Sequence, residues 1–173
     1  MIKRIVVPVD FSETSLRALD YAVQLSRPLN ARLTVVHVVE PVYYPMAGDL
    51  DGLGLNLSAV YTEIERAARA RMTQLAAKLK ARRIVVRTLL THGTPHHVIV
   101  ESAKKLKADL IIMSTHGRTG LSHALMGSVA ERVVRLAGCP VLTVPGRTAD
   151  TASRSRGTRP RQRRATAART RPR

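Results

Sequence analysis

A segment between residues 114 and 128 contains the residue types that hold an anionic ligand. Ser114-Thr115-His116-Gly117 follows a short apolar run, and Gly127-Ser128 precedes a run with helical spacing. Glycine lets the main chain approach a phosphate closely. A helix start offers unpaired N–H groups and a favourable dipole, and Ser128 adds a hydroxyl donor and a candidate cap. The pattern predicts an anion-binding loop, although a plain loop with a Gly-Ser cap shares it.

The common nucleotide and catalytic motifs are missing from the sequence. Neither a Walker A loop nor the GxGxxG fingerprint of dinucleotide-binding proteins occurs. No Ser/His/Asp triad or pair of carboxylates is legible, and His92, His96 and His97 lack the ligand spacing of a zinc site. The chemistry indicated by the sequence is therefore ligand binding, with no catalytic group beyond the anion-binding loop.

Five short apolar runs predict the strands that position this loop. Near-continuous apolar runs are typical of parallel strands buried on both faces. The five strands are expected at residues 4–9, 32–39, 84–90, 110–113 and 140–145. His37 lies within the second run and is expected to be a core residue with a hydrogen-bond partner.

Four helices are predicted between these strands. Ser12 is the expected N-cap of the first, which Pro28 and Asn30 end, and Thr94 with Pro95 opens the third. The fourth covers residues 128–136, with Gly138 as its expected C-cap. The second helix covers residues 59–80, and its expected packed face consists of Ile64, Ala67, Ala68, Arg71, Met72, Leu75 and Leu79. The long connection over residues 41–58 is interpreted as a lid or a linker.

The alternation of strands and helices predicts an α/β fold with a single doubly wound, five-stranded parallel sheet. The expected strand order is 3-2-1-4-5, with helices on both faces. Ligands of such sheets bind at the carboxyl ends of the strands, where the winding reverses. That point lies between strand one, which ends at Asp10, and strand four, which ends at Ser114. The two loops are therefore expected to line one crevice.

Composition places this fold in residues 1–147 of the 173-residue chain. Apolar residues make up 45% of the sequence and aromatic residues only 3%, so the core must be aliphatic. The single cysteine, Cys139, excludes an internal disulfide and is typical of a reducing compartment. Neither a secretory leader nor an apolar run of membrane-spanning length is present, so we expect a cytoplasmic protein without membrane contact.

Residues 148–173 form a basic tail of different composition. They contain nine arginines and one aspartate, so their net charge of +8 is nearly half of the chain's net charge of +17. Such a segment cannot bury apolar surface, so disorder is expected. Arginine can neutralise phosphates or acidic surfaces, and without aromatic residues any nucleic-acid binding would have little sequence preference.

Several segments in order resemble the universal stress protein family. They are residues 7–12, 33–38, 111–117, 127–131 and 139–145, and the resemblance covers about residues 1–146. ATP-binding members carry a glycine, two residues, a glycine, nine residues, and a glycine followed by Ser or Thr. Gly117, Gly127 and Ser128 match this motif, whereas Ser114 replaces the first glycine.

The resemblance implies an adenine-nucleotide site and a stress-response function, with slow hydrolysis at most. Asp10 would bind the ribose, an apolar slot would hold adenine, and backbone and hydroxyl donors of the loop would hold the phosphates. ATP would bind with Mg²⁺ or Mn²⁺, held mainly by phosphates and water. The implied site residues are Pro8, Val9, Asp10, Val38, Met113, Ser114, His116, Gly117, Gly127, Ser128, Val129 and Ala130.

The strand over Val141 to Val144 is expected at a sheet edge. An exposed edge offers unpaired N–H and C=O groups, so we expect a homodimer in which this strand meets its copy antiparallel. The resemblance implies the same arrangement. Two other functions stay open at this point. One is a dimeric interaction scaffold that has lost nucleotide binding, which Ser114 in place of the motif glycine would suit, and the other is association with nucleic acid through the tail. Asp10 could also simply cap the helix that follows.

Overall fold

The computed structural model describes residues 1–41, 57–117 and 126–146. Five parallel strands form one sheet in the order β3-β2-β1-β4-β5, which confirms the predicted topology. The elements are β1 (Arg4–Pro8), α1 (Glu13–Leu29), β2 (Arg32–Val39), α3 (Leu57–Ala81), β3 (Val86–His92), α4 (Pro95–Lys105), β4 (Leu110–Ser114), α5 (Ser128–Leu136) and β5 (Val141–Val144). No helix within these ranges is long and apolar enough to cross a membrane.

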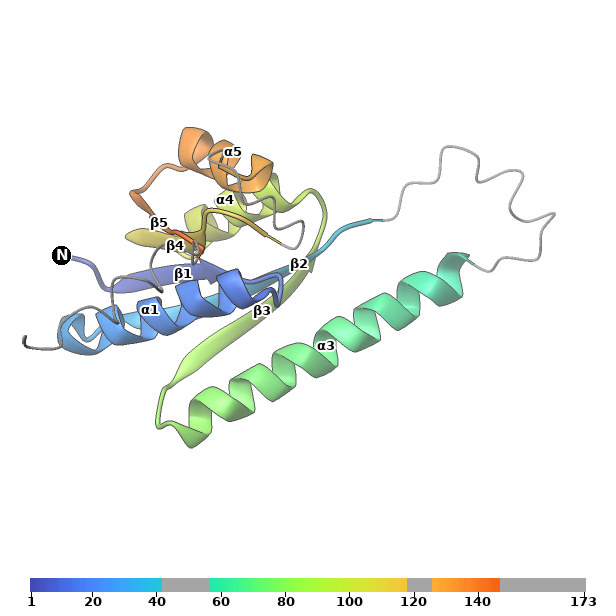
Figure 1. Cartoon of the computed structure of the whole chain (residues 1–173), viewed down its shortest axis with the longest axis horizontal. Coiled ribbons are helices and arrows are strands. Elements are labelled where there is room, and N and C mark those ends of the chain that lie inside the picture. Colours follow the sequence, from blue (N-terminus) through green and yellow to red (C-terminus); the bar gives the residue numbers. More distant parts are fainter. Residues whose placement is uncertain (42–56, 118–125, 147–173) are drawn as a thin grey trace, which may run out of the picture.

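Helices cover both faces of the sheet (Figure 1). α1 and α3 pack on one face, and α4 and α5 pack on the other. Successive strand residues point to opposite faces, so Val7 packs towards α1 and α3 while its neighbour Val6 packs towards α4 and α5. This two-sided burial explains why the strands read as continuous apolar runs. Cys139 is half-buried and packs within the second of these cores, as a small apolar side chain does.

The start and end of α1 agree with the sequence. Ser12 has extended backbone angles, and its hydroxyl accepts a hydrogen bond from the N–H of Ser15 at 3.2 Å. Asn30 closes the helix in the left-handed conformation, with φ 49° and ψ 45°. Pro28 lies in the last turn rather than beyond the helix. The first turn of α1 is therefore fixed directly beside the end of β1, where the ligand loop was predicted.

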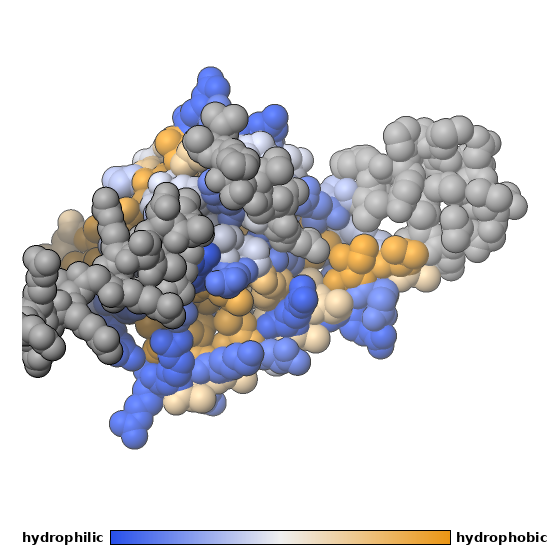
Figure 2. Space-filling view, viewed as in Figure 1, coloured by the Kyte–Doolittle hydropathy of each residue, from blue (hydrophilic) through white to orange (hydrophobic). Residues whose placement is uncertain are grey.

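α3 differs from the sequence prediction along its amino-terminal half. Ala68, Met72 and Leu79 are buried as expected, and Leu75 packs against them. The other residues assigned to that packed face, Ile64, Ala67 and Arg71, are exposed, Ile64 to 40%. For Ile64 the reason is geometric, because the amino-terminal half of the helix projects beyond the sheet and leaves an apolar strip uncovered (Figures 1 and 2). Arg71 belongs to the other half and extends over the Phe11 ring.

Several boundaries also differ. β3 begins at Val86 rather than Ile84, because Arg83 takes a left-handed turn (φ 58°) and the N–H of Ile84 still bonds to Leu79 O. Gly127, not Ser128, occupies the N-cap of α5, and Ala137, not Gly138, occupies its C-cap. The 118–125 part of the ligand loop, residues 42–56 of the long connection and the tail after residue 146 lie outside the described residues.

Candidate functional site

A cavity of about 320 Å³ lies between the carboxyl ends of β1, β2 and β4 and the start of α5. All twelve residues expected at the nucleotide site line this cavity. The lining also includes residues that the sequence analysis did not assign to a site, namely Ser15, Val36, His37, Glu40, Pro95, Ile99 and Thr115. Val36 and His37 lie in β2, and Glu40 follows its carboxyl end. Because the predicted strand order places β2 beside β1, these three residues could have been predicted at the site from the sequence.

Asp10 supplies a carboxylate at one side of the cavity. Its Oδ1 accepts hydrogen bonds from the N–H and the hydroxyl of Ser12, at 2.9 and 2.5 Å. Partial burial raises the pKa of Asp10, but the hydrogen bonds from Ser12 and Ser15 outweigh it and hold the pKa below the ordinary value of 3.8. Asp10 is therefore ionised at neutral pH. Ser12 caps α1, and Asp10 holds that capping residue instead of capping the helix itself.

The second carboxylate oxygen of Asp10 faces the loop after β4. A Cβ atom built on Gly117 would lie 2.8 Å from Asp10 Oδ2, inside any normal contact distance. A larger residue at position 117 would therefore require the Asp10 side chain to move, with no positive φ involved. This contact joins the β1 loop to the β4 loop through one carboxylate.

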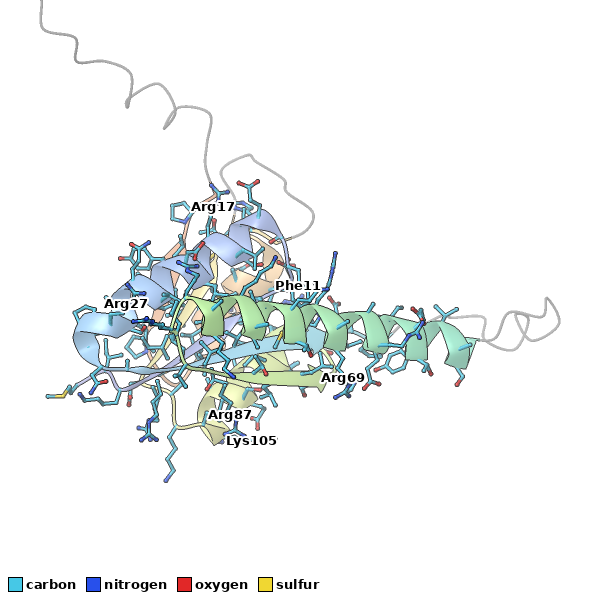
Figure 3. The ribbon with its side chains drawn as sticks, turned by 90° about the horizontal axis from the view of Figure 1, so that it is seen from below. Phe11, Arg17, Arg27, Arg69, Arg87 and Lys105 are labelled. Atoms are coloured by element: carbon cyan, nitrogen blue, oxygen red, sulfur yellow. The ribbon has the colours of Figure 1, made fainter. Side chains whose placement is uncertain are left out.

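Phe11 and His37 form a wall beside Asp10. Phe11 adopts φ 63°, a conformation that bulky residues rarely take, and its ring lies 4.5 Å from the His37 ring. The buried His37 donates from Nδ1 to Val9 O at 2.7 Å, which confirms the expected partnered core histidine. On the outer side the Arg71 guanidinium lies 5.3 Å from the Phe11 ring centroid. Figure 3 shows Phe11 beneath α3, the helix that carries Arg71. The turn that positions the Asp10 carboxylate is thus packed through Phe11, between the His37 ring and the Arg71 guanidinium.

Four side chains and one carbonyl organise the loop after β4. The carbonyl oxygen of His116 accepts from the Thr14 hydroxyl at 2.9 Å and from the Ser114 hydroxyl at 2.7 Å. Thr115 Oγ1 lies 2.9 Å from His116 Nδ1. Ser114, which replaces the first motif glycine, is 9% exposed, and its hydroxyl hydrogen is used within the loop. The loop therefore has a defined shape that includes the serine.

The start of α5 also lines the cavity. The N–H of Gly127 donates to Thr115 O at 2.8 Å, and a Cβ on Gly127 would lie 3.0 Å from that oxygen. The first bond of the helix joins the N–H of Glu131 to Gly127 O. The N–H groups of Ser128, Val129 and Ala130 consequently have no partner inside the helix. A helix start of this kind attracts negative charge.

The cavity lining thus combines an anionic acceptor, backbone donors and apolar side chains. Pro8, Val38 and Met113 contribute to the apolar lining. This arrangement suits a flat apolar ring joined to polar hydroxyls and an anionic tail.

The histidines weighed above as zinc ligands serve other contacts. His92 lies 3.5 Å from Glu65, and His96 is buried against the His97 ring. Burial lowers the pKa of His96, and the nearby charges of His97 and Arg132 lower it further. Within residues 1–41, 57–117 and 126–146, no three His, Cys, Asp or Glu side chains are grouped as metal ligands.

Comparison with known proteins identifies a family to which the chain is similar. The model of the universal stress protein family matches residues 1–145. A universal stress protein of Methanocaldococcus jannaschii is 37% identical over 145 residues, covering 83% of this chain and 82% of that protein.

Solved structures show the same likeness. The structure of a universal stress protein from Lactobacillus plantarum superposes with a TM-score of 0.71 at 28% identity, over 83% of this chain and 97% of that one. A universal stress protein in complex with cAMP gives 0.53 at 29% identity, over 83% and 97%. With a family model that covers most of the chain, a fold in the same strand order and a relative at this identity, the chain belongs to the universal stress protein family.

Proposed function

We propose that this stress-response family member binds an adenine nucleotide, ATP, in the cavity between the carboxyl ends of β1 and β4. The observation that carries the proposal is that the ionised Asp10 carboxylate and the N–H groups at the start of α5 line one cavity together with apolar side chains. A nucleotide has matching parts in the same order: a base, ribose hydroxyls and phosphates. Further support comes from a relative solved in complex with cAMP.

Each part of the nucleotide has candidate partners. Asp10 accepts from the ribose hydroxyls through the oxygen that Ser12 leaves available. Pro8, Val9 and Val38, with Met113 close by, provide the slot for adenine. Gly117, His116, Gly127, Ser128, Val129 and Ala130 surround the phosphates with main-chain and hydroxyl donors.

Mg²⁺ or Mn²⁺ would be held mainly by the phosphates and water. The described lining residues include two carboxylates, Asp10 and Glu40, which are too few for a cage of protein ligands. Hydrolysis of ATP in this proposal is slow at most, as the family resemblance implies. The protein then acts as a nucleotide-dependent regulator. The single cysteine supports a reducing, cytoplasmic location.

Native mass spectrometry and calorimetry test this function. Native mass spectrometry of the purified protein should show a bound adenine nucleotide. Titration with ATP should show binding that Asp10→Asn weakens about 10- to 100-fold, since an ionised acceptor is lost. Asp20→Asn is the matched control, because it makes the same chemical change at a carboxylate of α1 that pairs with Arg82 and does not line the cavity. Wild-type protein that binds no ATP under these conditions would favour a scaffold without nucleotide.

We also propose a homodimer through β5, the edge strand of the sheet. The carbonyls of Pro140 and Val144 accept bonds from β4, so the groups of Val141 and Thr143 point to the free edge. Leu142 and Val144 pack into the core shared with α1. Pairing with a second copy must therefore use the backbone of Val141 and Thr143 more than the side chain of Leu142.

A further inference from the structure

A larger open hollow lies at the opposite end of the sheet from the nucleotide cavity. It has a volume of about 1140 Å³ and runs across the amino ends of β1, β2 and β3. Four of its lining residues are basic, Lys3, Arg4, Arg32 and Arg87, and none of its described lining residues is acidic. We call this hollow the basic groove. Its charge sets it apart from the nucleotide cavity, where Asp10 and Glu40 are present.

Strand register gathers three of these arginines on one face. Arg4 of β1 lies opposite Arg32 of β2, and Arg87 of β3 lies opposite Thr34. Arg32 and Thr34 are two residues apart, so their side chains leave the same face of β2. From strand spacing and rise, the Cα atoms of Arg4 and Arg87 are about 12 Å apart, with Arg32 between them. The face is the one that α4 and α5 cover elsewhere, since Val6 beside Thr34 packs into their core.

The groove has more basic side chains than carboxylates that pair with them. Arg4 pairs with Asp109 at 3.0 Å. Arg32 and Arg87 make no ion pair with any carboxylate of the described residues, and both side chains are exposed. Arg4 lies opposite Arg32 on the neighbouring strand, and Asp109 compensates the charge of Arg4. A bound anion would compensate the charges of Arg32 and Arg87.

The end of α4 leaves the groove open. The helix ends at Lys105, and Leu106, its C-cap, is the last residue that lines the groove from that side. Figure 3 shows Arg87 and Lys105 on the side of the sheet away from α1 and α3, so a further lysine lies on the groove's side of the molecule. Val85, before β3, is 94% exposed at the rim.

We propose that the basic groove binds the phosphate backbone of a nucleic acid, without sequence preference. Guanidinium groups pair with phosphate oxygens, and a row of cations matches the closely spaced charges of a duplex. The groove has no aromatic or methionine side chain among its described lining residues. Binding through aromatic stacking platforms is therefore not expected, so little base preference is expected. Charge is the main attraction that we propose, and the repeated phosphates of a nucleic acid supply a regular row of negative charges to match it.

The test is binding of a fluorescein-labelled DNA duplex of mixed sequence to the full chain, followed by anisotropy over a salt series. The double variant Arg32→Gln/Arg87→Gln should lower the magnitude of the salt slope by about 1.8 and weaken binding at about 0.1 M salt by roughly tenfold or more. The matched control is Arg66→Gln/Arg135→Gln, which removes the same charge from α3 and α5. The basic tail is intact in all variants, so it contributes equally to each.

Arg32→Lys/Arg87→Lys should retain the wild-type slope, because charge is kept. Equal slopes for the Gln double variant and its control would overturn the proposal, and so would a groove-dependent affinity for poly-glutamate that exceeds that for DNA. Circular dichroism establishes that each variant is folded. Calorimetry with ATP should be unchanged by the groove variants, so a failure of the proposed nucleotide function leaves this inference intact and the reverse also holds.

Discussion

Replacing Gly117 with alanine should weaken ATP binding without unfolding the protein. The added Cβ would lie 2.8 Å from Asp10 Oδ2, about 0.6 Å inside the 3.4 Å at which ordinary contacts begin. The carboxylate must shift by about that distance, and the bond from the Ser12 N–H to Oδ1 would lengthen from 2.9 Å to about 3.5 Å, where a hydrogen bond is weak. Asp10 would then no longer be held towards the cavity.

The size of the effect follows from the bond that is lost. A hydrogen bond to a charged group contributes about 1.5–3 kcal/mol, which corresponds to about 10- to 150-fold in the dissociation constant for ATP. Stability should change little, because Gly117 has no positive φ and alanine reduces the entropy of the unfolded chain. The matched control is Gly138→Ala, where an added Cβ meets no atom within 4 Å.

Calorimetry with ATP measures the affinity, and carbon NMR of the Asp10 carboxyl gives a readout that needs no ligand. Because bonds from Ser12 lower the pKa of Asp10, their loss in Gly117→Ala should raise that pKa towards 3.8. An unchanged pKa of Asp10 together with wild-type affinity would refute the packing argument. A wild-type protein without ATP binding, but with the expected pKa shift in the variant, would refute only the nucleotide assignment.

Three further outcomes are expected. Gly127→Val should abolish ATP binding while the protein stays folded, since the valine side chain would press on Thr115 O and displace the loop from α5. Calorimetry measures the ATP affinity, and circular dichroism measures whether the variant is folded. Thr143→Pro removes an N–H from the free edge of β5 and should shift a dimer to monomer in sedimentation velocity, whereas a variant as dimeric as wild type would place the interface elsewhere. Hydrogen bonds from Arg4 and the neighbouring backbone hold the pKa of Asp109 at about 2, so its contribution to stability is complete above 3.8 and is lost as pH falls through about 2. The difference in melting temperature between wild type and Asp109→Asn should be constant above that window and narrow within it.

Much of the fold could be read from local patterns. Strands buried on both faces appear as apolar runs, and Ser12 and Asn30 mark the ends of α1 through side-chain and left-handed capping that belong to single residues. The alternation of these elements allowed the strand order to be predicted, and the structure confirms it. That order brings the end of β1 and the end of β4 together, and the twelve residues that the family resemblance implies line the cavity there.

Tertiary structure decided what depends on contacts between distant residues. Helical spacing assigned Ile64 to a packed face, but only the length of α3 relative to the sheet leaves that residue exposed. The requirement for glycine at position 117 comes from Asp10, which is far away in sequence. The basic groove likewise depends on strand register, which places Arg4 beside Arg32 and leaves Arg87 one step further across the sheet. Sequence by itself determined the elements and their order, because those follow from local periodicity and connection rules; register, helix overhang and loop contact are set by packing, which no local pattern contains.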